Sequence, residues 1–147
     1  MFTYNVQLAG YGFGQADDKG AIDLDEFLHF VQNFPWVEQL RRYQTIREGA
    51  SATVSAVDIL KNTILWISIA GTEKKPIYLV GYVYMKPVKK FWMPGKIRLK
   101  KWVDIFSFYT LDDTIPLFKL FFGGEDEKLA AALSTKEKFD SMPAAEY

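Results

Sequence analysis

Hydrophobic and polar residues alternate at the start of the chain, and this period of two predicts a half-buried strand from about residue 2 to residue 8. Between residues 24 and 34 the apolar positions recur at helical spacing instead. Asp23 and Glu26 predict a capping box at the start of this helix. Pro35 favours the opening of a second helix. The positions expected to face inward on that helix are Trp36, Val37, Leu40 and Tyr43.

The strongest strand signal is a hairpin in residues 63–85, where two β-branched and aromatic runs flank a polar turn at residues 71–76. Alternation places Ile67 and Trp66 on opposite faces of the first run. The second run has an aliphatic face that includes Leu79 and Val83. Its other face consists of Tyr78, Val80, Tyr82 and Tyr84. Both faces are largely apolar, so we expect each to be covered, or the tyrosine face to be a docking surface.

The rest of the pattern completes a fold of the α+β class. Residues 15–20 are expected to form a loop, and the tail after about residue 140 is expected to be frayed. The other predicted elements are strands at 52–60 and 102–109 and helices at 114–122 and 125–139. Together they predict one domain, residues 1–147, with an antiparallel β-meander of about four to five strands packed with N-terminal and C-terminal helix pairs.

Composition narrows the classes of protein. The chain is 49% hydrophobic and 16% aromatic, which is typical of a globular domain with one core. It has no cysteine, which excludes disulfides, thiolate nucleophiles and cysteine-based zinc sites. The first residues lack the basic and apolar regions of a signal peptide, and no stretch has the length of a membrane span. We therefore expect a cytoplasmic protein without a membrane partner.

An acidic stretch at residues 17–27, D-D-K-G-A-I-D-L-D-E-F, resembles the second half of an EF-hand calcium loop with Gly20 at its sharp turn. Gln15 occupies the first ligand position and Lys19 another, where an ammonium group would repel the ion. We therefore expect no metal site here, and an acidic loop that caps a helix instead.

Catalytic motifs are absent from the sequence, which has no P-loop, dinucleotide fingerprint or H-E-x-x-H. A Ser-His-Asp site would depend on His29 alone, without a G-x-S-x-G turn to present a serine. We expect His29 to be a partly buried structural residue, and we expect no catalytic residue and no cofactor.

A basic segment at residues 86–101 holds seven lysines and arginines, no acidic residue, and the rings of Phe91 and Trp92. Cations beside aromatic rings suit phosphate backbones and unstacked bases, but they suit an acidic protein partner as well. The formal net charge of zero argues against nucleic acid. We expect a protein partner to contact this segment and the tyrosine face. The predicted contact residues are Lys89, Lys90, Phe91, Trp92, Arg98, Lys101, Tyr78, Tyr82 and Tyr84.

Three phrases carry a resemblance to a known group of proteins: F-P-W at residues 34–36, the Tyr/Trp-rich meander, and D-D-x-x-x-L-F-x-x-F-F-G-G at 112–124. In build the chain resembles the small cytoplasmic immunity proteins that bacteria encode beside polymorphic or secreted toxins. The resemblance implies a non-enzymatic inhibitor that covers the active site of its cognate toxin. Two alternatives stay open. One is a nucleic-acid accessory protein that uses residues 86–101. The other is a ligand-binding or enzymatic domain with an aromatic pocket lined by Trp66, Tyr78, Tyr82 and Tyr84.

Overall fold

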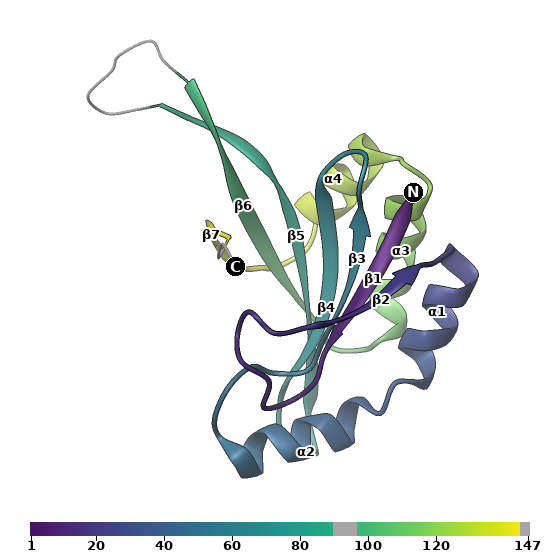
Figure 1. The fold of residues 1–147 in the computed structure, drawn as a ribbon, viewed down its shortest axis with the longest axis vertical. Coiled ribbons are helices and arrows are strands. Elements are labelled where there is room, and N and C mark those ends of the chain that lie inside the picture. Colours follow the sequence, from purple (N-terminus) through teal and green to yellow (C-terminus); the bar gives the residue numbers. More distant parts are fainter. Residues whose placement is uncertain (90–96, 145–147) are drawn as a thin grey trace.

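The computed structural model describes residues 1–89 and 97–144, which form one antiparallel sheet with helices on one of its faces (Figure 1). The seven strands are β1 (Phe2–Gln7), β2 (Asp17–Ala21), β3 (Thr53–Asp58), β4 (Thr63–Gly71), β5 (Pro76–Lys89), β6 (Ile97–Phe108) and β7 (Lys138–Pro143). The helices are α1 (Leu24–Asn33), α2 (Trp36–Ile46), the 3-10 helix η1 (Asp112–Thr114), α3 (Ile115–Phe122) and α4 (Asp126–Ser134). The strands lie in the order β2-β1-β3-β4-β5-β6-β7. The fold is therefore α+β, as predicted.

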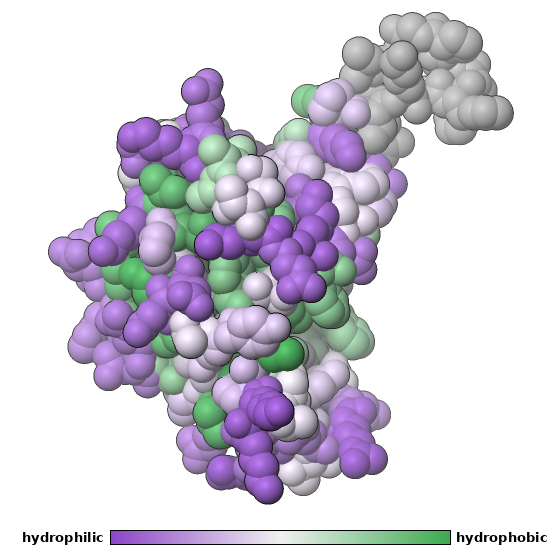
Figure 2. Space-filling model, turned by 180° about the vertical axis from the view of Figure 1, so that it is seen from behind, coloured by the Kyte–Doolittle hydropathy of each residue, from purple (hydrophilic) through white to green (hydrophobic). Residues whose placement is uncertain are grey.

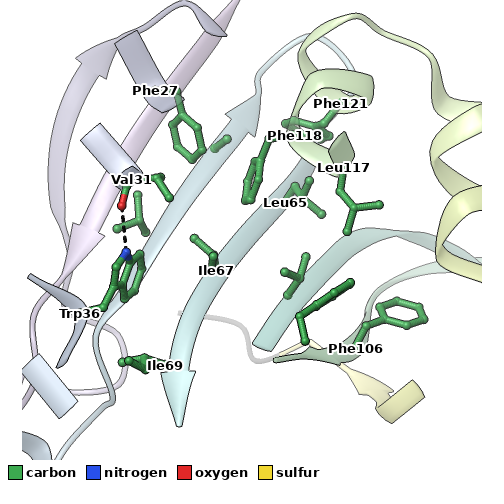
Figure 3. Close-up of a cluster of buried hydrophobic side chains, with 14 of the residues drawn as sticks. Phe27, Val31, Trp36, Leu65, Ile67, Ile69, Phe106, Leu117, Phe118 and Phe121 are labelled. Carbon is green, nitrogen blue, oxygen red and sulfur yellow. Dashed lines mark hydrogen bonds between the residues drawn. The ribbon is translucent and has the colours of Figure 1, made fainter. Parts of the chain in front are cut away.

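All four α-helices pack on the same face of the sheet, where their apolar sides meet buried residues of β1, β3, β4, β5 and β6. On the sheet side the core includes Leu65, Ile67 and Phe106, and Figure 3 shows these side chains pointing toward the helices. The helices contribute Phe27, Val31, Trp36, Leu40, Leu117, Phe118, Phe121, Leu129 and Leu133. The indole of Trp36 donates a buried hydrogen bond of 2.9 Å to the Val31 carbonyl, which links α1 to α2 (Figure 3).

Local sequence signals explain where the first helices begin. The Asp23 carboxylate accepts a hydrogen bond of 2.9 Å from the Glu26 backbone N–H, and the Glu26 carboxylate accepts one of 3.4 Å from the Asp23 backbone N–H, so the predicted capping box is confirmed. Pro35 stands immediately before α2. Leu40 is buried on this helix, but Val37 is 39% exposed, so its predicted inward position is wrong.

The predicted central hairpin is confirmed, and its register shows which residues share a face. Ile67 lies opposite Val80 and Leu65 lies opposite Tyr82, all on the helix-covered face. Trp66 lies opposite Gly81 on the other face. No α-helix of the described chain packs on that second face, which we call the open face.

The sheet has seven strands rather than the predicted four to five. The two edge strands were not predicted because their sequences lack an apolar pattern. Residues 15–20 are not wholly a loop: β2 begins at Asp17 and pairs with β1. The predicted helix at 125–139 ends at Ser134, and β7 then pairs with β6 as far as Pro143, where fraying was expected. An edge strand gains its hydrogen bonds from its neighbour's backbone, so its own side chains can be polar.

Strands β5 and β6 extend beyond their neighbours and project from the body as a two-stranded ribbon (Figure 1). The last pair between β4 and β5 is Ile64 with Val83, and β7 reaches only to Trp102 on β6. The predicted strand at 102–109 therefore begins earlier, at Ile97. We call residues 84–89 and 97–102 the arm.

Candidate functional site

The arm carries most of the separation of charge in this chain. The basic segment at residues 86–101 holds seven of the 18 lysines and arginines and none of the 18 aspartates and glutamates. The rest of the chain consequently has eleven basic and 18 acidic residues. The formal net charge of zero is thus the sum of a strongly basic segment, five of whose seven cations belong to the arm, and an acidic remainder. This separation of charge makes a field that can orient a charged partner.

Apolar side chains accompany these charges on the open side of the arm. Leu99 is 60% exposed and Met85 is 37% exposed. Figure 2, which views the molecule from behind, shows hydrophobic side chains in small areas divided by hydrophilic ones. The arm therefore offers apolar contact area beside cations, a combination that protein interfaces use.

A chain of polar side chains fixes the base of the arm. Tyr84 on β5 donates a hydrogen bond of 3.0 Å to Asp104 on β6, and the Ser141 hydroxyl on β7 donates one of 2.6 Å to the same carboxylate. The Trp102 indole donates a bond of 2.8 Å to the Ser141 oxygen. The ammonium group of Lys86 lies 4.3 Å from the centroid of the Trp102 ring, where a cation–π interaction adds to the attachment.

This network also changes the ionisation of a phenol. Burial, followed by the hydrogen bond to the Asp104 carboxylate, raises the pKa of Tyr84 to about 12. Tyr82 stacks on Tyr84 with ring centroids 5.5 Å apart, and burial raises the pKa of Tyr82 as well. Both phenols act here as hydrogen-bonding and packing groups.

The predicted tyrosines lie on the helix-covered face. Tyr78 packs edge-to-face on Trp36, with ring centroids 6.0 Å apart. Tyr82 and Tyr84 line a cavity of about 510 Å³ between β5, β6 and α4, with Lys136 and Lys138 also in its lining. Contact of these tyrosines with a partner stays a prediction, and Tyr82 and Tyr84 would reach it through this cavity.

The remaining predicted contact residues belong to the arm or to the turn between its strands. Lys101 is partly exposed and lies opposite Met85, on the open side. Only the backbone of Lys89 and Arg98 is described, and it lies in β5 and β6. The predicted contacts Lys90, Phe91 and Trp92 lie outside the described residues.

The alternative aromatic pocket does not form as predicted, because Trp66 and the three tyrosines lie on opposite faces of the sheet. Trp66 lines a separate groove of about 550 Å³ on the open face. The side chains along this groove come from β1, β3, β4, β5 and β6, the β1–β2 loop and the end of β7. Sequence patterns indicated this tryptophan but not its neighbours.

Two other predicted features have plain structural roles. His29 is exposed rather than partly buried, and its Nδ1 lies 3.3 Å from the Asn33 side-chain amide on the next turn of α1. In the acidic stretch, Asp17 accepts a hydrogen bond of 2.8 Å from the Tyr11 hydroxyl, and Gly20 has a φ of 86° within β2. Residues 1–89 and 97–144 contain no group of three or more histidines and carboxylates arranged to hold a metal ion.

Sequence reasoning missed Asp104 and Ser141, which hold β5, β6 and β7 together at the base of the arm. Side-chain alternation along β6 places Trp102 and Asp104 on one face, so the sequence pattern could have predicted that these two members of the network lie side by side. Ser141 lies 37 residues further along the chain, and no local signal links it to Asp104.

No protein-family model matches the chain, and comparisons with curated proteins and with solved structures give no match. Among the helices of the described residues, none has both the length and the apolar character needed to cross a membrane.

Proposed function

We propose that this chain is a non-enzymatic protein-binding domain of the immunity type, whose arm contacts an acidic surface on a cognate toxin. The observation that carries the proposal is the arm itself: five lysines and arginines and no acidic residue, on a ribbon that projects from an acidic body. Such a protein acts by occlusion in the cytoplasm, where it covers the active site of the toxin.

The charges and the apolar side chains of the arm contribute to different steps of binding. The cations of the arm accelerate the encounter with an acidic surface, because long-range attraction raises association rates. Exposed Leu99 and Met85 then supply contact area that excludes water once the partner is in place. The network of Tyr84, Asp104 and Ser141 supports both roles, since a fixed base reduces the entropy lost when the arm is bound.

Charge favours a protein partner over nucleic acid. A phosphate backbone carries negative charge along its whole length, so a long duplex would meet the acidic body as well as the arm. A folded toxin can confine its acidic residues to the area that the arm touches. The surplus of seven acidic residues outside the basic segment therefore suits a discrete acidic patch better than a polyanion.

Charge reversal on the arm tests this proposal, with the product of the neighbouring gene as the candidate toxin. The test variant carries Lys100→Glu and Lys101→Glu, and the matched control carries Lys74→Glu and Lys75→Glu in the exposed β4–β5 turn. Both variants have the same net charge. We expect the arm variant to associate about tenfold more slowly at low salt and with a weaker salt dependence, whereas the control stays within about twofold of wild type.

Three results would count against the proposal. Equal association rates for the arm variant and the control would remove the arm from the interface. Absence of a complex, together with failure of the wild-type chain to rescue growth of cells that express the candidate toxin, would end the immunity assignment. Binding to an oligonucleotide with a steep salt dependence, without binding to the toxin, would favour the nucleic-acid alternative instead.

A further inference from the structure

A row of four residues crosses the open face, each on a neighbouring strand. Asn5 on β1 lies opposite Ser55 on β3, Ser55 lies opposite Trp66 on β4, and Trp66 lies opposite Gly81 on β5. An amide, a hydroxyl and an indole are therefore consecutive neighbours along the floor of the open-face groove. The register of the sheet alone brings residues 5, 55, 66 and 81 into one line.

Gly81 provides the space in which the indole lies. A Cβ atom on residue 81 would overlap the Trp66 ring at Cε2, Cζ2 and Nε1, so the ring is seated directly on the β5 backbone. Gly81 itself is buried, whereas Trp66 is partly exposed. One side of the indole is consequently packed on the sheet, and the ring presents a firmly seated aromatic surface to the groove.

The groove has a wall on each side of this platform. The side-chain amide of Gln7 donates hydrogen bonds of 3.1–3.2 Å to the carbonyls of Gly12, Phe13 and Gln15, which holds the β1–β2 loop at one edge. Residues 142–144 form the other edge, and the Ala144 N–H donates a bond of 3.0 Å to the Lys101 carbonyl. Both walls are thus fixed by hydrogen bonds to strands of the sheet.

Among the described residues, the lining of the groove contains no charged side chain, although 24% of the chain is charged. Its polar members come from β1, β3, β4 and the β1–β2 loop, and they are Asn5, Gln7, Gln15, Thr53, Ser55 and Ser68. Its aliphatic members lie on the other side of Trp66 and include Leu79, Val83 and Val103. A charged ligand would lose its hydration here without a counter-charge, so the lining selects a neutral ligand.

We propose that this groove binds a neutral sugar, with the apolar face of the sugar ring on Trp66 and its hydroxyl groups directed to Asn5 and Ser55. Amides and hydroxyls both donate and accept hydrogen bonds, as each sugar hydroxyl does. Neither Asn5 nor Ser55 has a side-chain hydrogen bond to another described residue, so both keep this capacity for a ligand. The volume of about 550 Å³ is within the range of small-molecule sites.

Nuclear magnetic resonance titration of the full chain tests the proposal directly. The probes are methyl glycosides of glucose, galactose, mannose and N-acetylglucosamine and the corresponding disaccharides, each added to about 10 mM so that millimolar dissociation constants are measurable. We expect at least one probe to produce saturable shifts at Asn5, Ser55, Gly81 and the Trp66 indole N–H. That indole signal is identified by its loss in Trp66→Leu.

Variants separate this site from unspecific contact. We expect Trp66→Leu to abolish the saturable shifts and Ser55→Ala to weaken binding about three- to tenfold. Ser107→Ala is the matched control, because it removes a hydroxyl from the open face of β6 outside the groove, and it should bind as wild type does. If Trp66→Leu fails to fold, the comparison of Ser55→Ala with Ser107→Ala decides the matter.

Several outcomes would overturn the proposal. They are the absence of saturable shifts in the groove for every sugar, equal weakening by Ser55→Ala and Ser107→Ala, and binding of an uncharged heteroaromatic probe such as caffeine without binding of any sugar. None of these results depends on the arm. The sugar site and the proposed toxin contact therefore stand or fall separately.

Discussion

Ile67 is the residue whose truncation tests the arrangement of the sheet and helices most directly. It lies on β4, the fourth of the seven strands, with 0% of its surface exposed. Its neighbours across the sheet, Val54 and Val80, are also fully buried, and helix residues cover it on one side (Figure 3). The site is enclosed on all of these sides, so it has little freedom to collapse after a deletion.

The expected loss of stability follows from this enclosure. Ile67→Ala removes three carbon atoms, which corresponds to about 2.4 kcal/mol at roughly 0.8 kcal/mol per buried methylene. A cavity term adds to this value because the surroundings relax only in part. We therefore expect the free energy of unfolding to fall by about 3–5 kcal/mol, within the range of large-to-small core substitutions.

Urea unfolding followed by circular dichroism measures this loss. With a denaturant dependence of about 2 kcal/mol per molar urea, the midpoint should fall by roughly 1.5–2.5 M. Ile59→Ala is the matched control, because Ile59 is 51% exposed after β3, and it should change stability by about 0.5 kcal/mol or less. A loss below about 1 kcal/mol for Ile67→Ala, or an equal loss for both variants, would refute the assignment of Ile67 to the helix-covered face.

Three further predictions concern single local features. Gly49→Ala should lower the melting temperature by several degrees, because residue 49 has a φ of 77° and the new Cβ would lie 2.5 Å from a backbone carbonyl oxygen. Asp23→Ala should destabilise the fold by about 0.5–2 kcal/mol in urea unfolding through loss of the capping box, whereas Asp25→Ala in the same turn of α1 should have a smaller effect. The pKa of Tyr84 is about 12 in the folded chain and about 10 when unfolded, so the stability that its proton contributes is complete below pH 10 and is lost as pH rises toward 12. Between pH 9 and pH 12 the free energy of unfolding should accordingly fall less steeply for Tyr84→Phe than for wild type. An identical slope would contradict the bond to Asp104.

Elements with a local signal were predictable from the sequence. The central hairpin consists of two β-branched and aromatic runs around a polar turn within residues 63–85, and the capping box joins residues three apart. In both cases the information lies within one strand pair or one helical turn. The α+β class follows from the same local patterns, since they give the order of helices and strands.

The edge strands and the arm depended on partners that are distant in sequence. Neither D-D-K-G-A in β2 nor K-F-D-S-M-P in β7 alternates as a half-buried strand does, yet each pairs with the free edge of a neighbour. Pro87 suggests a break in β5. The strand continues because its pairing with β4 ends at Val83, so the missing N–H of proline removes no hydrogen bond to β4.

The two proposed sites differ in the same way. The seven cations of the basic segment all fall within residues 86–101, so their concentration is evident from the residue order itself, whereas the attachment of the arm through Asp104 and Ser141 is not. Side-chain alternation along β4 predicted that Trp66 and Ile67 lie on opposite faces of the sheet, but it did not predict which face the helices cover. The register of β1, β3, β4 and β5 decided that Asn5, Ser55 and Gly81 lie in one row with Trp66, because side-chain alternation is a property of one strand and pairing is a property of the whole sheet.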